Sequence, residues 1–313
     1  MLTLKSVSKR FTRRLDAIEK LARRLGAEVH EHTVHALDCV SFTVAKGEVV
    51  GLVGESGCGK STVARLACGL HEPSAGRVVF DGPRRAIQMI FQDPFASLNP
   101  RMRVEQIVGE APRVHGLVSR EKTGEYVAAM LERVGLDASY RRRYPHQFSG
   151  GQRARIGIAR ALAVQPEFLV CDEAVAALDV SIQAQVLNLF IDLRRDLGLT
   201  YLFISHDLGV VRHLSDRVVV MYLGRVVEVA KTDELFAAPN HPYTQALLEE
   251  VPRLDRRGRT YVPIKGEIPS PLNPPGGCHF HPRCPHAMPR CATEVPVLRE
   301  IAPGRQSACH LTT

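Results

Sequence analysis

The sequence lacks any hydrophobic segment long enough to cross a membrane. No run in its 313 residues approaches the roughly 18 apolar residues that a spanning helix needs. The N-terminal stretch MLTLKSVSKRF also lacks the apolar segment of about 7–15 residues that marks a secretory signal. We therefore expect a globular protein of the cytoplasm.

Acidic residues are fewer than basic ones, 33 against 41, which gives a formal net charge of +8. The arginines stand in short scattered groups, at residues 13–14, 23–24, 141–143 and 256–257. Such groups are typical of solvated faces and loops, and an anionic membrane surface or nucleic acid are the alternatives. The charge balance alone excludes no class of function.

The eight cysteines fall into two groups. Four stand among apolar or glycine residues and are predicted to be small buried side chains: Cys39, Cys58, Cys68 and Cys171. The other four lie within the last 36 residues, beside several histidines, in a proline-rich segment: Cys278, Cys284, Cys291 and Cys309. A reducing cytoplasm makes a disulfide framework the weaker explanation, so the second group indicates metal binding.

Strand-like and helical patterns alternate through the first 245 residues. The stretches VVGLVG, FLVCDE and TYLFIS predict buried strands, and RVVVMYLGRVVEVA predicts two strands joined at Leu223 and Gly224. STVARLACGL predicts a helix, and so does SIQAQVLNLFIDLRRDLG, which Gly198 closes. This alternation predicts an α/β fold with a mostly parallel sheet covered by helices.

Two segments depart from this alternation. Residues 13–34 have a charged helical pattern and are predicted to be a surface insertion. From Pro252 onward Pro, Gly and Cys dominate, and the strand and helix periodicities fade. We therefore expect a large domain over residues 1–250 and a small extension over residues 251–313.

The stretch GESGCGKST predicts a phosphate-binding loop, because Gly54, Gly59, Lys60 and Ser61 have the required spacing between a strand and a helix. Glycines allow backbone N–H groups to converge on an anion at the positive end of a helix. Lys60 would supply a charge to the β- and γ-phosphates, and Ser61 would supply a hydroxyl ligand for Mg²⁺.

Two further stretches complete a nucleotide site. The predicted strand FLVCDE ends in Asp172, which can hold Mg²⁺, and in Glu173, which can orient or deprotonate a water that attacks the γ-phosphate. FSGGQRARIGIARAL places Ser149 at the start of a helix with two glycines, which predicts a second anion-binding site. Two phosphate sites far apart in one chain suggest that two molecules sandwich the nucleotide.

The sequence resembles the ATP-binding subunits of ABC transporters. The resemblance rests on six motifs in the family's order: GESGCGKST, FQDPFASLNP, SGGQ, FLVCDE, ALD and ISHD. It implies an ABC cassette of the P-loop NTPase class, with a RecA-like core, an antiparallel β subdomain and a helical subdomain at about residues 93–165. It also implies an ATPase that closes with a second cassette when ATP binds.

The resemblance assigns roles residue by residue. The catalytic groups would be Glu173, His206, Gln92 and Lys60. The Mg²⁺ ligands would be Ser61, Gln92 and Asp172. ATP bound to this chain would contact Phe11 through adenine and the loop residues Gly54, Gly57, Gly59, Lys60, Ser61 and Thr62. The signature residues would contact the ATP that is bound to the partner cassette: Ser149, Gly150, Gly151 and Gln152. Asp179 would link the two ATP sites.

Two later stretches, HPYTQALL and GEIPSPLNPPGGCHFHPRCP, resemble the ATPases of dipeptide and oligopeptide importers, a group that includes nickel importers. This implies a homologous ATPase as partner. Of the two ATPases in the pair, this chain would be the second. It also implies two membrane-spanning permease subunits, an extracytoplasmic substrate-binding protein, and a peripheral position on the cytoplasmic face of the inner membrane. The alternatives are import of nickel or another small solute, and a soluble ABC ATPase that acts on nucleic acid. For the importer we expect no nucleic-acid partner.

The C-terminal cysteines have the spacing C-x5-C-x6-C-x17-C. Four thiolates can hold zinc or anchor an iron–sulfur cluster. Some relatives in this group carry a 4Fe-4S cluster here, so we expect a cluster before zinc, with unliganded thiols as the third possibility. Because this segment is distant in sequence from Lys60 and Glu173, a structural or redox-sensing role is predicted.

Overall fold

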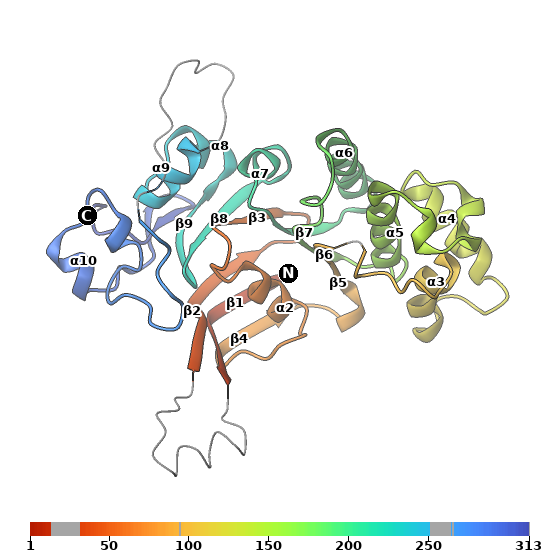
Figure 1. Cartoon of the computed structure of the whole chain (residues 1–313), viewed down its shortest axis with the longest axis horizontal. Helices are drawn as coiled ribbons and strands as arrows, with labels where there is room; N and C mark the ends of the chain where they lie inside the picture. The colour runs from red at the N-terminus through yellow and green to blue at the C-terminus, as the bar shows by residue number, and fades with distance from the viewer. Residues whose placement is uncertain (14–31, 94, 251–263, 265, 313) are drawn as a thin grey trace, which may run out of the picture.

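The computed structural model of the chain describes residues 1–13, 32–93, 95–250, 264 and 266–312. Two β-sheets organise these residues, with the smaller sheet below the larger one in Figure 1. The smaller sheet is antiparallel, in the strand order β2 (His32–Val44), β1 (Leu2–Arg13) and β4 (Ala75–Phe80). It is the antiparallel part that the resemblance implies. The predicted insertion at residues 13–34 falls almost wholly outside the described residues.

The larger sheet confirms the predicted mostly parallel arrangement. Its strand order is β10 (Arg299–Ala302), β11 (Arg305–Ser307), β9 (Arg225–Lys231), β8 (Arg217–Tyr222), β3 (Val49–Val53), β7 (Thr200–Ile204), β6 (Phe168–Asp172) and β5 (Ile87–Ile90). The five strands from β8 to β5 are parallel, and β9, β11 and β10 are antiparallel. The strands expected from VVGLVG, FLVCDE, TYLFIS and RVVVMYLGRVVEVA are β3, β6, β7 and the pair β8–β9.

The parallel strands are mostly apolar because both of their faces are covered. Along β6, Phe168 and Val170 pack into the core between the two sheets, where α2 (Lys60–Ala67) lies. Leu169 and Cys171 point to the other face and pack into a second core with the helices. The period of two residues along each strand thus divides the interior into two apolar layers.

Helices cover the second face and one side of the molecule. α3 (Val104–Val114), α4 (Thr123–Arg133) and α5 (Gly150–Leu162) lie together beyond β5 (Figure 1). α6 (Val180–Leu197) packs against α5 and ends at Gly198, whose φ of 63° fits the predicted glycine stop. Short 3₁₀ turns occur at η1 (Arg84–Ala86), η2 (Ala138–Arg142) and η3 (Pro145–Gln147). The bounds of a helical subdomain at 93–165 stay a prediction.

The C-terminal segment completes the larger sheet, although its sequence shows little periodicity. Its described elements are η4 (His281–Arg283), α10 (Pro289–Thr293), β10 and β11, which follow α7 (Leu208–Leu214), α8 (Thr232–Ala237) and α9 (Pro242–Glu249) in the chain. β11 pairs with β9 through Gln306 opposite Val229 and Ser307 opposite Glu228. The last residues are therefore tied to β9 by a strand ladder.

The isolated cysteines are only partly as predicted. Cys58 and Cys171 are buried and Cys68 is half-buried, whereas Cys39 is exposed. Cys39 lies on β2, at the edge of the smaller sheet, with φ of 52°. Cys39 faces solvent because the pairing with β1 shifts register here: Val7 lies opposite Val40 and Lys9 opposite Leu37, so a bulge breaks the alternation that buries Leu37.

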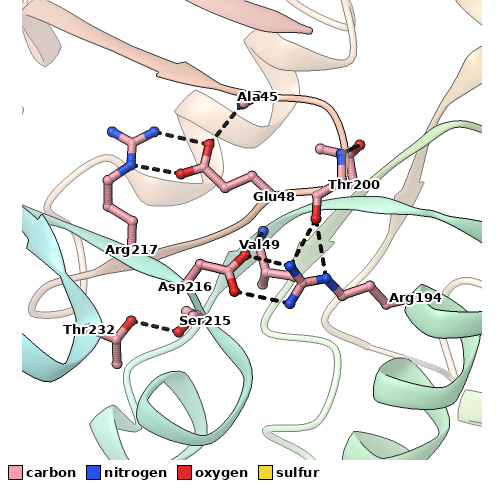
Figure 2. A network of polar contacts seen from close by, with 10 residues as sticks. Ala45, Glu48, Val49, Arg194, Thr200, Ser215, Asp216, Arg217 and Thr232 are labelled. Atoms are coloured by element: carbon pink, nitrogen blue, oxygen red, sulfur yellow. Dashed lines mark hydrogen bonds and ion pairs between the residues drawn. The ribbon is translucent and has the colours of Figure 1, made fainter.

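A network of ion pairs fixes the start of β3, at the end opposite the predicted phosphate loop (Figure 2). Glu48 accepts hydrogen bonds from Arg217 Nε at 2.8 Å and from the Ala45 N–H at 2.8 Å. Asp216 accepts from the Val49 N–H at 2.8 Å and from Arg194 Nη2 at 2.7 Å. These contacts join β3 to β8 and α6.

None of the helices in the described residues is long and apolar enough to span a bilayer.

We expect Glu48→Gln to lower the free energy of unfolding by about 1–2 kcal/mol, because an amide cannot accept both hydrogen bonds that Arg217 donates, from Nε at 2.8 Å and from Nη2 at 3.2 Å. Urea denaturation of the full chain measures this loss. Glu167→Gln is the matched control: its partner Lys46 is 3.1 Å away, but both side chains are more than half exposed. That change should cost less than about 0.5 kcal/mol. An equal loss in the two variants would contradict a special role for the Glu48 network.

Candidate active site

The glycine loop joins the end of β3 to the start of α2 and packs tightly on its surroundings. A Cβ atom on Gly54 would lie 2.1 Å from the Met221 carbonyl oxygen, and one on Gly59 would lie 2.5 Å from the Ala36 carbonyl oxygen. Both residues also have positive φ, 151° and 107°. Only glycine fits these two positions. Gly57, with φ of 80°, lies at the open outer side of the loop.

Lys60 and Ser61 begin α2 directly behind this loop. Lys60 is buried, and its Nζ donates to the carbonyl oxygens of Gly54 at 2.7 Å and Glu55 at 3.0 Å. The ammonium group therefore lies within the curve of the loop. Ser61 Oγ donates to Asp172 Oδ1 at 3.1 Å, and Thr62 follows in the same turn.

Asp172 ends β6 and is buried beside Ser61. Burial raises the pKa of Asp172, and the hydrogen bond from Ser61 opposes the rise. A hydroxyl and a carboxylate side by side are the hard oxygen donors that Mg²⁺ takes when phosphates and water supply its other ligands. The described residues hold no set of three or more His, Cys, Asp or Glu side chains that could bind a metal alone. The residues present fit a Mg²⁺ ion that arrives with a nucleotide.

Glu173 has an unusual backbone. Its φ is 49°, a left-handed value uncommon for a residue other than glycine. Its N–H donates to the Ile204 carbonyl oxygen at 3.0 Å, which ties the end of β6 to the end of β7. Such conformations cost on the order of 1–3 kcal/mol and gather at functional sites.

The Glu173 carboxylate contacts two side chains that follow other strands of the sheet. Its Oε2 accepts a hydrogen bond from Gln92 Nε2 at 2.9 Å and lies 3.3 Å from His206 Nδ1. Gln92 follows β5, and His206 follows β7. The structure thus brings Gln92, Glu173 and His206 together at the carboxyl end of the parallel sheet, where α/β proteins bind ligands. The Glu173 side chain is 16% exposed and that of His206 is 59% exposed, so the group opens to solvent.

The signature residues lie on another part of the molecule. Ser149 caps α5: its Oγ accepts from the Gln152 N–H at 3.3 Å, and Gln152 Oε1 accepts from the Ser149 N–H at 3.1 Å. Gly151 packs against Ile182 near the start of α6, and Gly150 lies beside it. Asp179, the N-cap of α6, is exposed. α5 and α2 are well apart in Figure 1, so one chain does not bring the signature to its own phosphate loop.

Phe11 is a surface residue rather than a core aromatic. It lies on β1 with 38% of its surface exposed, edge-on to His71 at a ring distance of 5.5 Å. Lys9 Nζ lies 5.1 Å from its ring centroid. The structure leaves this ring accessible for stacking.

Sequence reasoning missed three residues that act on the loop: Glu55, Tyr243 and Arg283. Arg283 donates to both carboxylate oxygens of Glu55, at 2.7 and 2.9 Å. Tyr243 Oη accepts from the Glu55 N–H at 2.8 Å. The sequence offered one signal for this contact. Glu55 is acidic and lies inside an anion-binding loop, so a cationic side chain is needed to neutralise it.

The four C-terminal cysteines line one small cavity with His241, His281 and His286. They are Cys278, Cys284, Cys291 and Cys309. Burial raises the pKa of Cys278 to about 11 and raises the pKa values of Cys284 and Cys309. Backbone N–H groups of Phe280, His286 and Leu311 lie against these three thiols and partly oppose the rise in pKa that burial causes. The predicted clustering is present, but within the described residues no set of side chains has the arrangement of a metal-ion site.

Two protein families match the sequence. Residues 37–176 match the ABC transporter family, and residues 227–291 match the C-terminal region of oligopeptide/dipeptide transporters. The oligopeptide transport ATP-binding protein AppF of Bacillus subtilis is 52% identical over 295 residues, which cover 89% of this chain and 90% of AppF.

Solved structures agree with this similarity. The dimeric ATP-binding cassette MJ0796, in a post-hydrolysis state bound to ADP and Pi, has a TM-score of 0.62 and 28% identity over 74% of this chain and 99% of its own. The protein cbiO1 of Clostridium perfringens, part of the ABC transporter complex cbiONQ, has a TM-score of 0.61 and 27% identity over 75% of this chain and 90% of its own. The chain therefore belongs to the family of ABC transporter ATP-binding proteins, and it carries the C-terminal region of the oligopeptide/dipeptide group.

Proposed function

We propose that this chain is the ATP-hydrolysing subunit of a membrane importer of di- and oligopeptides. The observation that carries the proposal is the contact of the Glu173 carboxylate with both Gln92 and His206, beside the Lys60 loop. The similarity to AppF supports the peptide substrate. No observation in the structure favours nickel over peptides.

In this proposal the loop from Gly54 to Thr62 binds the ATP phosphates through its N–H groups and Lys60. Ser61, Asp172 and Gln92 would hold Mg²⁺, which supplies charge neutralisation for phosphoryl transfer. Glu173 orients a water against the γ-phosphate and accepts its proton, and His206 contacts the γ-phosphate. The contact between Gln92 and Glu173 supports their common action on that water.

A second ATPase completes the site. Ser149, Gly150, Gly151 and Gln152 would bind the γ-phosphate of ATP on the partner's loop, because the start of a helix attracts anions. The exposure of Ser149 and Asp179 supports an interface there. Phe11 would stack on adenine. The partner is proposed to be a homologous subunit, with this chain as the second of the pair.

The same proposal defines the assembly. The pair of ATPases would bind two permease subunits on the cytoplasmic face of the inner membrane, and a substrate-binding protein would deliver the peptide from outside. Residues 1–250 would form the cassette, with its helical subdomain at 93–165, and residues 251–313 the extension. The match of residues 227–291 to the transporter C-terminal region supports the importer assignment.

We also propose that the cysteine cavity holds one 4Fe-4S cluster, with zinc as the second choice. Four sulfur donors around one cavity, with backbone N–H groups directed at them, are the donor set of such clusters. When bound, the cluster would stabilise the fold of the extension and give it redox sensitivity.

Glu173→Gln should leave ATP binding intact and slow hydrolysis on the order of 10²-fold or more, because the amide keeps the shape but cannot accept a proton. Single-turnover hydrolysis in the assembled complex, with the partner's site inactivated, measures this. Glu167→Gln, at the other end of β6, is the control and should hydrolyse ATP normally. Normal turnover by the Glu173 variant would remove this residue from the mechanism.

Ser149→Arg should weaken ATP-driven association of the two cassettes while the isolated chain binds ATP as before. The reason is that Ser149 is expected to act only on the partner's nucleotide. Light scattering with and without ATP reports association, and titration of the isolated chain reports binding. Ser139→Arg, at another exposed helical turn, is the control. Equal loss of binding by the isolated Ser149 variant would refute the sandwich.

Anaerobic purification should give a coloured protein with about four irons and four sulfides per chain, since thiolate-bound clusters absorb visible light. Cys284→Ser should lose this absorbance. Zinc in the absence of iron would show that the cavity binds zinc instead of a cluster. A colourless, metal-free chain would exclude both.

A further inference from the structure

Glu55 presents an electrostatic conflict within the phosphate-binding loop. It directly follows Gly54, and an unpaired carboxylate there would repel the phosphates that the loop binds. The structure resolves the conflict with Arg283, whose two terminal nitrogens donate to the two carboxylate oxygens at 2.7 and 2.9 Å. The side chains are only 5% exposed for Arg283 and 19% for Glu55, so solvent screens the pair weakly.

The backbone of Glu55 is fixed as well as its side chain. Its N–H donates to Tyr243 Oη at 2.8 Å, and its carbonyl oxygen accepts from Lys60 Nζ at 3.0 Å. Tyr243 and Arg283 lie 188 and 228 residues away from Glu55 in sequence. Tyr243 and Arg283 thus hold Glu55, whose carbonyl oxygen positions the Lys60 ammonium group.

Arg283 is itself held rigidly. It ends η4, and its Nη1 also lies 3.3 Å from Tyr222 Oη. Phe280, one turn earlier, packs against Tyr222 and Tyr243 with ring distances of 5.2 and 5.3 Å. This aromatic cluster joins η4, β8 and α9 into one packed unit.

We propose that the C-terminal region organises the phosphate-binding loop through Arg283, which is a positioning residue for ATP binding. Arg283 neutralises Glu55 and fixes the loop in the geometry that receives phosphate; it touches no nucleotide. The inference rests on the proposed ATP site. The cysteine segment is distant from the loop in sequence but lies near it in space, because Arg283, which contacts Glu55, directly precedes Cys284.

Removal of Arg283 leaves a half-buried, unpaired carboxylate, which is costly and draws the loop toward water. The phosphate-binding N–H groups then lose their preorganised geometry, so ATP binds more weakly. Because the loop holds the phosphates in the ground state and in the transition state alike, the defect should appear in KM far more than in kcat.

The test uses the full-length chain and a fluorescent ATP analogue with Mg²⁺. Arg283→Gln should raise the Kd by roughly 10-fold or more, within the range expected when a binding group is displaced. In the assembled complex the KM for ATP should rise by a similar factor at nearly constant kcat. An unchanged Kd, or a fall in kcat without a change in KM, would overturn the proposal.

The double variant Glu55→Gln with Arg283→Gln guards against a trivial folding defect. The double variant has no charge at either position and so leaves no unpaired carboxylate in the loop, and its Kd should return to within about 3-fold of the wild-type value. A Kd as high as that of the single variant would contradict the neutralising role of Arg283. Thermal unfolding of each variant shows which proteins are folded.

Arg305→Gln is the matched control. Arg305 also joins the C-terminal segment to the cassette, through Glu228 at 3.6 Å and the Ala238 carbonyl oxygen at 2.6 Å. Neither contact involves the phosphate-binding loop, so the Kd should stay unchanged. A rise equal to that of Arg283→Gln would mean that any loosening of this segment weakens binding, and would overturn the specific role.

Lys60→Ala separates this inference from the proposed site. Unimpaired nucleotide binding by Lys60→Ala would refute the proposed site itself. Lost binding by Lys60→Ala together with normal binding by Arg283→Gln would refute only the role of Arg283.

Discussion

The close approach of the glycine loop to its neighbours constrains the rest of this structure. Gly54 lies against the Met221 carbonyl oxygen and Gly59 against that of Ala36, with no room for side chains. The Gly224 N–H adds a hydrogen bond to the Cys58 carbonyl oxygen at 2.9 Å. The loop is therefore held between β8 and the smaller sheet, and its shape depends on both.

This constraint explains the placement of the other groups. Asp172, Glu173 and His206 stand at the ends of strands that are paired in register with β3 or with its neighbour β7. The hydrogen bond from the Glu173 N–H to the Ile204 carbonyl oxygen aligns two of these ends. The left-handed backbone of Glu173 then directs its carboxylate to Gln92 and His206. The sheet acts as a rigid base, and the chemistry is confined to its carboxyl edge.

The sequence locates these residues at the carboxyl edge of the sheet because its signals are local. Glycines at fixed spacing, a lysine at a helix start and carboxylates at a strand end each report a short-range requirement of the backbone. The pairing of β11 with β9 and the Glu55–Arg283 pair were not predicted, since neither follows from any local period. Glu55 carried a clue in its sign of charge, but its partner lies 228 residues away. The predicted burial of Cys39 was wrong for a related reason: the bulge that exposes it depends on the pairing of β2 with β1, which no local pattern shows.

ATP binding at the loop from Gly54 to Thr62, with hydrolysis at Glu173, is the core of the proposed function. An experimental structure of the ATPase pair with Mg²⁺ and a non-hydrolysable ATP analogue tests it most directly. We expect phosphates against Lys60, Mg²⁺ beside Ser61 and Asp172, the partner's signature helix on the γ-phosphate, and Glu55 still paired with Arg283. A nucleotide bound away from this loop, or a γ-phosphate remote from Glu173, would contradict it.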